Sequence, residues 1–175
     1  MRKYYDYCCD TENDEDTIAN SNLIKLYDIC FKYCESFSVI FFTSLNPENV
    51  WNDCEKMNYF SEFSSLATKI MNTKEWPGHR GKHEAVLMSL PCNEQTRKLL
   101  ETVTTNIRDF VGCWGVNNPE DIAFYRSDGS AMFYSTIHAC IFHINADDNE
   151  DISEVLSILK WNECEQWYHD KKRWF

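Results

Sequence analysis

Two spacings of apolar residues alternate along the chain and predict which segments are helices and which are strands. From Leu23 to Cys34, apolar side chains recur every three or four residues, which predicts a helix that Asn20 or Ser21 can cap. Residues 37–43 form a short β-branched and aromatic run, so they are predicted to be a central strand. This part of the chain therefore indicates a helix packed beside a buried strand.

The middle of the chain predicts further helices, one loop and one strand. Residues 46–48 place a capping asparagine, a first-turn proline and an early acid in order, so a helix carrying Trp51 is predicted to follow. Helical spacing continues through residues 59–70, whereas a proline and glycines predict a loop over residues 72–82. Residues 84–90 are predicted to be a strand.

The clearest local signal is an Asp-Gly pair at positions 128–129, which lies between two strand-like runs, residues 121–127 and 130–144. Asp-Gly favours a two-residue type I′ turn, because both central residues of that turn need positive φ. With this turn, Phe124 is predicted to lie opposite Phe133 on one face of a long β-hairpin.

Two more helices complete the predicted secondary structure. Asn93 can cap a helix whose apolar positions extend to Ile107, and this helix has an acid in its first turn. The acids within residues 147–154 are predicted to cap and begin a last helix that carries Val155. Part of the negative charge in this acidic run therefore has a local structural use.

Length and composition predict a single core. A chain of 175 residues is about one domain long, and its hydrophobic share of 43% can fill a core without metals or disulfides. No repeat or linker divides residues 1–175, so one α+β domain is predicted, an antiparallel sheet with a long β-hairpin packed against several helices. Residues 1–18 are predicted to be a flexible acidic segment, and residues 160–175 an aromatic C-terminal tail.

Charge is the strongest compositional bias of the chain. Its 28 Asp and Glu residues against 17 Lys and Arg residues give a formal charge of −11. Such a charge repels the phosphates of nucleic acids and anionic lipids, so neither a nucleic acid nor a membrane is an expected partner. A basic protein is the natural complement, because opposite charge speeds association and selects against wrong partners.

The nine cysteines indicate a reducing compartment. Their number is odd, their spacing has no disulfide framework, and the sequence has no secretory signal pattern. No apolar run approaches the roughly 18 residues that a membrane span needs. We therefore expect a cytoplasmic protein whose cysteines are reduced.

Residues capable of chemistry are present, but they match no catalytic or metal-binding pattern. His79 and His83 are four apart, and a glycine at position 81 breaks the helix that would bring them together. His138 and Cys140 lie on one predicted strand, whereas a nucleophile and its base usually come from different elements. We predict no catalytic residue, metal or cofactor. The alternative is a small metal- or Cys/His-dependent hydrolase that uses these four residues.

One segment carries a resemblance to known proteins. Residues 119–129 read P-E-D-I-A-F-Y-R-S-D-G, and together with the strand that continues to His138 they resemble a segment of small bacterial proteins. Some of these proteins are similar to immunity proteins of polymorphic-toxin and contact-dependent inhibition systems, and the likeness extends to the Trp-Pro-Gly sequence at 76–78. Ala139 departs from the pattern, in which an acid often follows the histidine. The resemblance implies a cytosolic, single-domain protein that blocks a toxin made alongside it.

Charge and resemblance together predict an immunity- or antitoxin-like inhibitor that binds a cognate toxin or another basic protein, such as a nuclease with a positively charged cleft. The predicted contacts combine the acids of the last helix with tryptophans that can anchor an interface. They are Asp147, Asp148, Glu150, Asp151, Glu154, Trp161 and Trp167. A scaffold subunit of a larger complex is a third alternative, and the sequence does not determine the oligomeric state.

Overall fold

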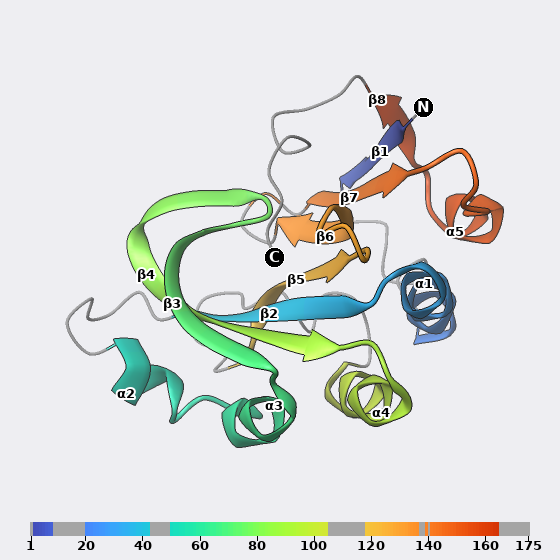
Figure 1. The fold of residues 1–175 in the computed structure, drawn as a ribbon. Coiled ribbons are helices and arrows are strands. Elements are labelled where there is room, and N and C mark those ends of the chain that lie inside the picture. Colours follow the sequence, from blue (N-terminus) through green and yellow to red (C-terminus); the bar gives the residue numbers. More distant parts are fainter. Residues whose placement is uncertain are drawn as a thin grey trace.

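Figure 1 shows the computed structural model, which describes residues 2–8, 20–42, 50–104, 118–136, 139 and 141–164. Over these residues the chain forms one antiparallel sheet of eight strands in the order β3-β4-β2-β5-β6-β7-β1-β8. The strands are β1 (Lys3–Cys8), β2 (Ser36–Phe42), β3 (Lys69–Trp76), β4 (His79–Pro91), β5 (Glu120–Tyr125), β6 (Ala131–Thr136), β7 (Ile141–Ala146) and β8 (Asn162–Cys164). The helices are α1 (Asn20–Tyr33), α2 (Val50–Cys54), α3 (Phe60–Leu66), α4 (Glu94–Val103) and α5 (Ser153–Ile158). The predicted α+β class is confirmed.

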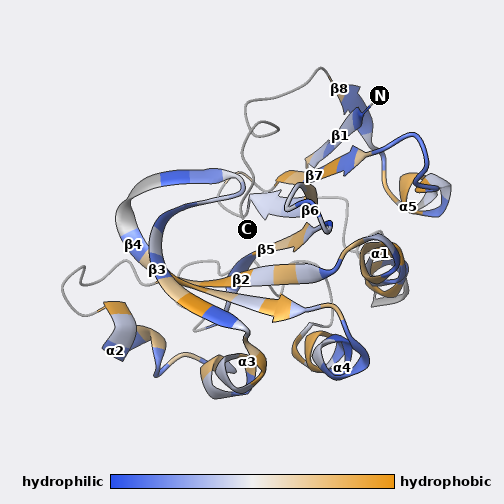
Figure 2. Ribbon diagram, viewed as in Figure 1, coloured by the Kyte–Doolittle hydropathy of each residue, from blue (hydrophilic) through white to orange (hydrophobic). Residues whose placement is uncertain are grey.

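The helices of the described residues lie along one face of the sheet, and we call this the helix face (Figure 1). One buried cluster joins apolar residues of all these helices to alternate positions of the strands. Phe124 lies at its centre, with ring centroids 5.3 Å from Phe37 and 5.6 Å from Phe31. Figure 2 shows the corresponding hydrophobic colour on α1 and along β2 and β4. We call the opposite side of the sheet the second face.

The strongest sequence signals for helix and strand are confirmed. α1 begins at Asn20, and β2 occupies the predicted central strand. Asn93 caps α4, because its side-chain oxygen accepts a hydrogen bond from the Thr96 amide at 3.0 Å, and the Thr96 hydroxyl accepts one from the Asn93 amide. This reciprocal arrangement satisfies amides that a helix N-terminus otherwise leaves without partners.

The loop predicted for residues 72–82 is wrong, because most of this segment belongs to the β3–β4 hairpin. Trp76 pairs with His79, and Pro77 and Gly78 make the turn between them. Proline fixes the φ of the first turn residue, and glycine accepts the φ of +82° at the second. The predicted helix over 59–70 also ends early, since α3 stops at Leu66 and β3 begins at Lys69.

The predicted Asp-Gly hairpin exists, but its turn differs from type I′. The amide of Arg126 donates to the carbonyl of Ser130, so the loop contains the three residues between them. Gly129 alone among these three has positive φ, at +77°. A bulge then shifts the register by one residue, so Phe124 still lies opposite Phe133 as predicted. The long second strand is also divided, into β6 and β7.

The N-terminal strand was not predicted. Residues 3–8 lie within the segment predicted to be flexible, yet they form β1 between β7 and β8. Its helix-face residues, Tyr5 and Tyr7, pair with Ile144 and Phe142 of β7. Among the helices of the described ranges, none has the length and apolar character required to cross a bilayer.

Candidate functional site

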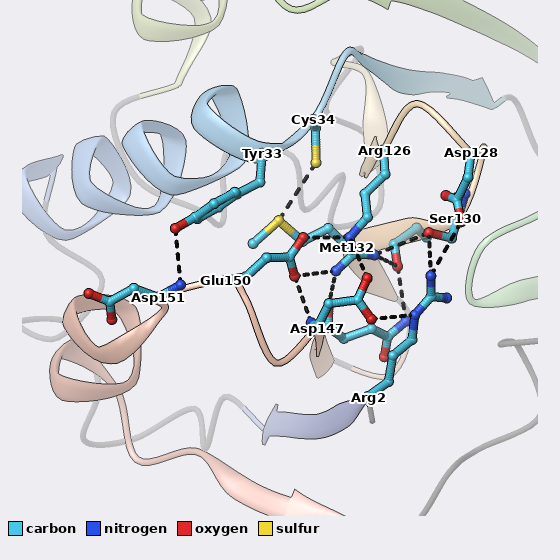
Figure 3. A network of polar contacts seen from close by, with 12 residues as sticks. Arg2, Tyr33, Cys34, Arg126, Asp128, Ser130, Met132, Asp147, Glu150 and Asp151 are labelled. Carbon is cyan, nitrogen blue, oxygen red and sulfur yellow. Dashed lines mark hydrogen bonds and ion pairs between the residues drawn. The ribbon is translucent and has the colours of Figure 1, made fainter.

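Two of the predicted docking acids, Asp147 and Glu150, contact the arginines Arg2 and Arg126, as Figure 3 shows. The Arg126 guanidinium donates to both carboxylate oxygens of Glu150, each at 2.6 Å, and the two side chains are 9% and 5% exposed. It also donates to the backbone carbonyls of Ala131 and Asn145. Paired, hydrogen-bonded geometry of this kind offsets the cost of burying charge. Glu150 therefore has a structural role, because it pairs the β7–α5 loop with Arg126 of the β5–β6 turn.

Arg2 extends the same network to the start of the chain. Its Nε donates to Asp147 Oδ1 at 2.8 Å, and its Nη2 lies 3.0 Å from the Ser130 hydroxyl and 3.4 Å from Asp128 Oδ2. Asp147 Oδ2 also lies 3.6 Å from Arg126 Nε. The network thus joins residue 2, the β5–β6 turn and the β7–α5 loop.

The remaining predicted contacts lie around α5. Asp148, Asp151 and Glu154 are exposed, but Asp151 accepts hydrogen bonds from Ser153 and Glu154 lies 3.7 Å from Lys25. Much of the negative charge of the acidic run is therefore compensated within the chain. Whether these residues bind a partner stays a prediction.

Of the two predicted tryptophans, only Trp161 lies within the described residues. Trp161 packs 5.9 Å from the Tyr7 ring and donates its indole N–H to the Val155 carbonyl at 3.0 Å. The half-buried Trp161 thus contacts both α5 and β1 and has a structural role. Trp167 lies outside the described residues.

A second polar arrangement lies on the opposite side of the sheet, where β6, β7 and β1 run side by side. His143 Nδ1 lies 2.6 Å from Asp6 Oδ1, and His143 Nε2 lies 3.3 Å from Thr136 Oγ1. The Tyr134 ring stacks on the imidazole, with centroids 4.3 Å apart and planes 21° apart. We call Thr136, His143 and Asp6 the second-face triad.

The register of the sheet explains why these side chains meet. Asp6 and Tyr134 are the direct cross-strand neighbours of His143, on β1 and β6 respectively. Thr136 lies two residues further along β6, so its side chain shares their face. Three strands remote in sequence thus bring a hydroxyl, an imidazole and a carboxylate into one row.

The environment of His143 favours a neutral ring with a defined tautomer. Burial lowers the pKa of His143 below its usual value, although the neighbouring Asp6 carboxylate opposes the shift. Because a carboxylate only accepts hydrogen bonds, Nδ1 carries the proton that is donated to Asp6. Nε2 is then an acceptor, and it faces the Thr136 hydroxyl. Burial, with a smaller contribution from Asp6, raises the pKa of Cys164 to about 11.

Buried acids form another polar cluster of the second face, at the β3–β4 hairpin. The Trp76 indole donates to Asp121 Oδ2 at 2.6 Å, and the His79 ring stacks on Trp76 with centroids 4.0 Å apart. Asp121 has a φ of +44°, in the left-handed region that non-glycine residues rarely adopt. Burial, with a smaller contribution from Asp121, raises the pKa of Glu120 to about 8. Groups with pKa values shifted in this way are typical of functional sites and of structural networks.

Gly78 connects the hairpin to the second-face triad. A Cβ at this position would lie 2.2 Å from Thr136 Oγ1, so only glycine fits against this hydroxyl. Figure 1 shows how the β3–β4 hairpin curves away from the helices to reach β6, and Figure 2 shows that its far end is mostly hydrophilic. The turn of the hairpin therefore helps to shape the surroundings of Thr136.

The hydrolase residues suggested by the sequence do not come together in the described part of the chain. His79 packs between Trp76 and Phe42. His138, Cys140 and the side chain of His83 lie outside the described residues. Within those ranges, no three histidine, cysteine or acidic side chains are grouped so as to hold a metal ion. Burial also raises the pKa of Cys54 to about 11, which disfavours the reactive thiolate.

An exposed tryptophan is a further candidate that the sequence alone did not single out. Trp51 on α2 is 38% exposed. Its ring lies edge-on to Phe60, with centroids 5.7 Å apart, and its indole N–H donates to Glu55. The side chain is therefore held in a defined position while part of its surface stays accessible.

No family model matches the chain, and the searches of curated proteins and of solved structures gave no match. Residue geometry and charge are therefore the grounds for any functional conclusion.

Proposed function

We propose that the chain is a cytoplasmic, immunity-type inhibitor that neutralises a toxin by binding a basic surface of it. The observation that carries this proposal is the exposed and positioned Trp51 in a strongly acidic chain. Tryptophan is enriched among the residues that dominate binding energy at protein interfaces. Rigid aromatic side chains also lose little conformational entropy on binding. We place the centre of the docking surface at Trp51.

Charge around α2 fits a basic partner. Asp53 and Glu55 follow Trp51 along the chain, and Glu62 lies in the first turn of α3. Lys56 is the one cation of this segment, residues 50–66, and it lies 3.2 Å from Asp53. Acids therefore exceed bases here, whereas the acidic run near α5 is largely compensated by Arg2, Arg126 and neighbouring lysines. An arginine of the partner could contact both the Trp51 ring and a carboxylate.

The partner to test is the purified product of the reading frame directly upstream, because an immunity gene is expected to follow its toxin gene. We expect the chain to bind this product and to rescue the growth of cells that express it. Trp51→Ala should weaken binding by at least tenfold, and Glu55→Lys should mainly slow association. Met71→Ala is the matched control, since Met71 is 37% exposed on β3, and it should leave binding unchanged.

Two outcomes would count against the proposal. Neither binding nor growth rescue with the upstream product would overturn the inhibitor function. Weaker binding on Glu154→Lys together with unchanged binding on Trp51→Ala would move the docking surface to the acidic run near α5. Calorimetry and a growth assay measure both outcomes directly.

A further inference from the structure

We infer that the second-face triad is a site for acyl transfer, in which Thr136 is the nucleophile, His143 is the general base and Asp6 is the positioning residue. This activity is separate from the proposed inhibition of a toxin, and it uses a different part of the molecule. The inference begins from three side chains on three strands that form a continuous chain of polar contacts.

The geometry fits the roles that nucleophilic catalysis requires. A hydroxyl nucleophile needs a base within hydrogen-bond reach, and that base needs a third group to orient it. Thr136 Oγ1 lies 3.3 Å from His143 Nε2, a separation that is common before a substrate is bound. Asp6 lies 2.6 Å from the other ring nitrogen and fixes the tautomer that leaves Nε2 as the acceptor.

Packing holds the imidazole in this position. The His143 side chain is 16% exposed and that of Asp6 is 30% exposed, so the pair is sheltered but still reachable from solvent. The Tyr134 ring covers one face of the imidazole. A simple cross-strand polar ladder needs the pairing of His143 with Asp6, but it does not need a hydroxyl aligned with the remaining nitrogen. That alignment is what distinguishes this row from a ladder.

Charge and packing restrict the substrate class. An anionic substrate would approach the Asp6 carboxylate and a chain of net charge −11, so an uncharged or cationic compound is favoured. Gly78 packs against Thr136 Oγ1, so the acyl group close to the hydroxyl must be small. The site is therefore suited to small uncharged or cationic carboxylic esters.

The reaction follows from these roles. The Thr136 oxygen attacks the ester carbonyl carbon while His143 Nε2 takes the hydroxyl proton, and the C–O bond to the leaving alcohol then breaks. The leaving oxygen receives the proton from His143, which leaves an ester between Thr136 and the acyl group. Water then attacks this ester with His143 again as the base, which releases the carboxylic acid and restores the hydroxyl.

The test uses the full chain and p-nitrophenyl acetate as the probe. We expect release of p-nitrophenol with acetylation of the peptide that contains Thr136, detected by mass spectrometry after digestion. Thr136→Val should abolish this adduct, His143→Asn should slow its formation at least tenfold, and Thr136→Ser should keep it or accelerate it. Melting temperatures of all variants show whether each one remains folded.

The role of Asp6 needs a readout that a structural contribution alone would not change. Asp6→Asn should slow acetylation and shift its pH midpoint to lower values, because the carboxylate raises the pKa of His143. Acetylation confined to lysines or cysteines, or equal acetylation of the Thr136 peptide in His143→Asn, would overturn the inference. Binding of the upstream gene product by the same variants tests the proposed function separately.

Discussion

The two faces of the sheet are built on different principles. On the helix face, Phe124 packs among other aromatic rings in one continuous apolar cluster. On the second face, two smaller apolar clusters are combined with hydrogen bonds between buried side chains, as in the pairs Trp76–Asp121 and Ser38–Tyr125, at 2.6 and 2.8 Å. The helix face is specified by burial, which is tolerant of geometry, whereas the second face also depends on directional contacts, which are not.

This difference indicates which face can support proton-transfer chemistry. An apolar cluster contributes stability but offers no group that can accept a proton or a charge. The second face holds the carboxyls of Asp6, Glu120 and Asp121, the imidazoles of His79 and His143, and several hydroxyls in partly dehydrated surroundings, where the pKa values of ionisable groups are easily shifted. Substitutions at Phe124, Glu120 and Tyr125 test whether the faces differ in this way.

The largest expected effect comes from the helix face. Phe124→Ala removes a fully buried ring, and it should lower the free energy of unfolding by about 4 kcal/mol through lost burial and a cavity. Urea denaturation followed by circular dichroism measures the change. Met71→Ala on the exposed edge strand β3 is the control and should change little. A loss below about 1 kcal/mol for Phe124→Ala would contradict a tightly packed helix face.

A smaller and pH-dependent effect is expected at Glu120. Its folded-state pKa of about 8 lies above the usual value of 4.5. Below pH 4.5 the carboxyl is therefore protonated in both the folded and the unfolded chain, and its ionisation does not affect the free energy of unfolding. As pH rises from 4.5 to 8, the unfolded chain loses this proton while the folded chain keeps it, so stability falls across that window. Glu120→Gln should remove this fall and be more stable than the parent at pH 8, by roughly 3 kcal/mol.

Thermal or urea unfolding at pH 5 and pH 8 measures the Glu120 effect. Glu62→Gln, which changes an exposed acid of α3, is the matched control. A parent and a Glu120→Gln variant with the same pH dependence would show that this carboxyl is ionised in the folded chain as readily as in the unfolded chain.

The smallest expected effect is at the Ser38–Tyr125 hydrogen bond. Tyr125→Phe keeps the ring and removes the hydroxyl, so the free energy of unfolding should fall by about 1 kcal/mol. A double-mutant cycle with Ser38→Ala isolates the contact, because the second substitution should then cost less than it does alone. Strictly additive losses would mean that the two hydroxyls contribute independently of each other.

Local signals in the sequence predicted those elements whose boundaries depend on neighbouring residues. Asn93 and Thr96 cap α4 by contacts within one turn, and the pattern of β2 follows from its burial. β3 escaped prediction because its residues do not alternate between apolar and polar, and because Pro77 and Gly78 resemble a loop rather than a hairpin turn. Pairing with β4 makes β3 a strand, and that contact lies outside any local window.

The candidate sites depended still more on contacts across the chain. Of the acids predicted to cap and begin the last helix, only Glu154 lies in α5, which begins at Ser153 after an N-cap residue, Ile152, that makes no side-chain cap hydrogen bond. The pairing of Asp147 and Glu150 with Arg2 and Arg126 could not be read from their spacing. Asp6 and His143 belong to strands at opposite ends of the sequence, and only the sheet order places them together. The exposure of Trp51 likewise depends on how α2 packs.

The position of β1 has a consequence for the order in which the protein forms. Among the described elements this strand is made first, whereas its neighbours β7 and β8 are among the last. Strand pairing over such a long sequence separation forms late, because most of the chain must be synthesised before the contact can form. Tyr5 and Tyr7 can therefore pair with Ile144 and Phe142 only after translation has passed β7.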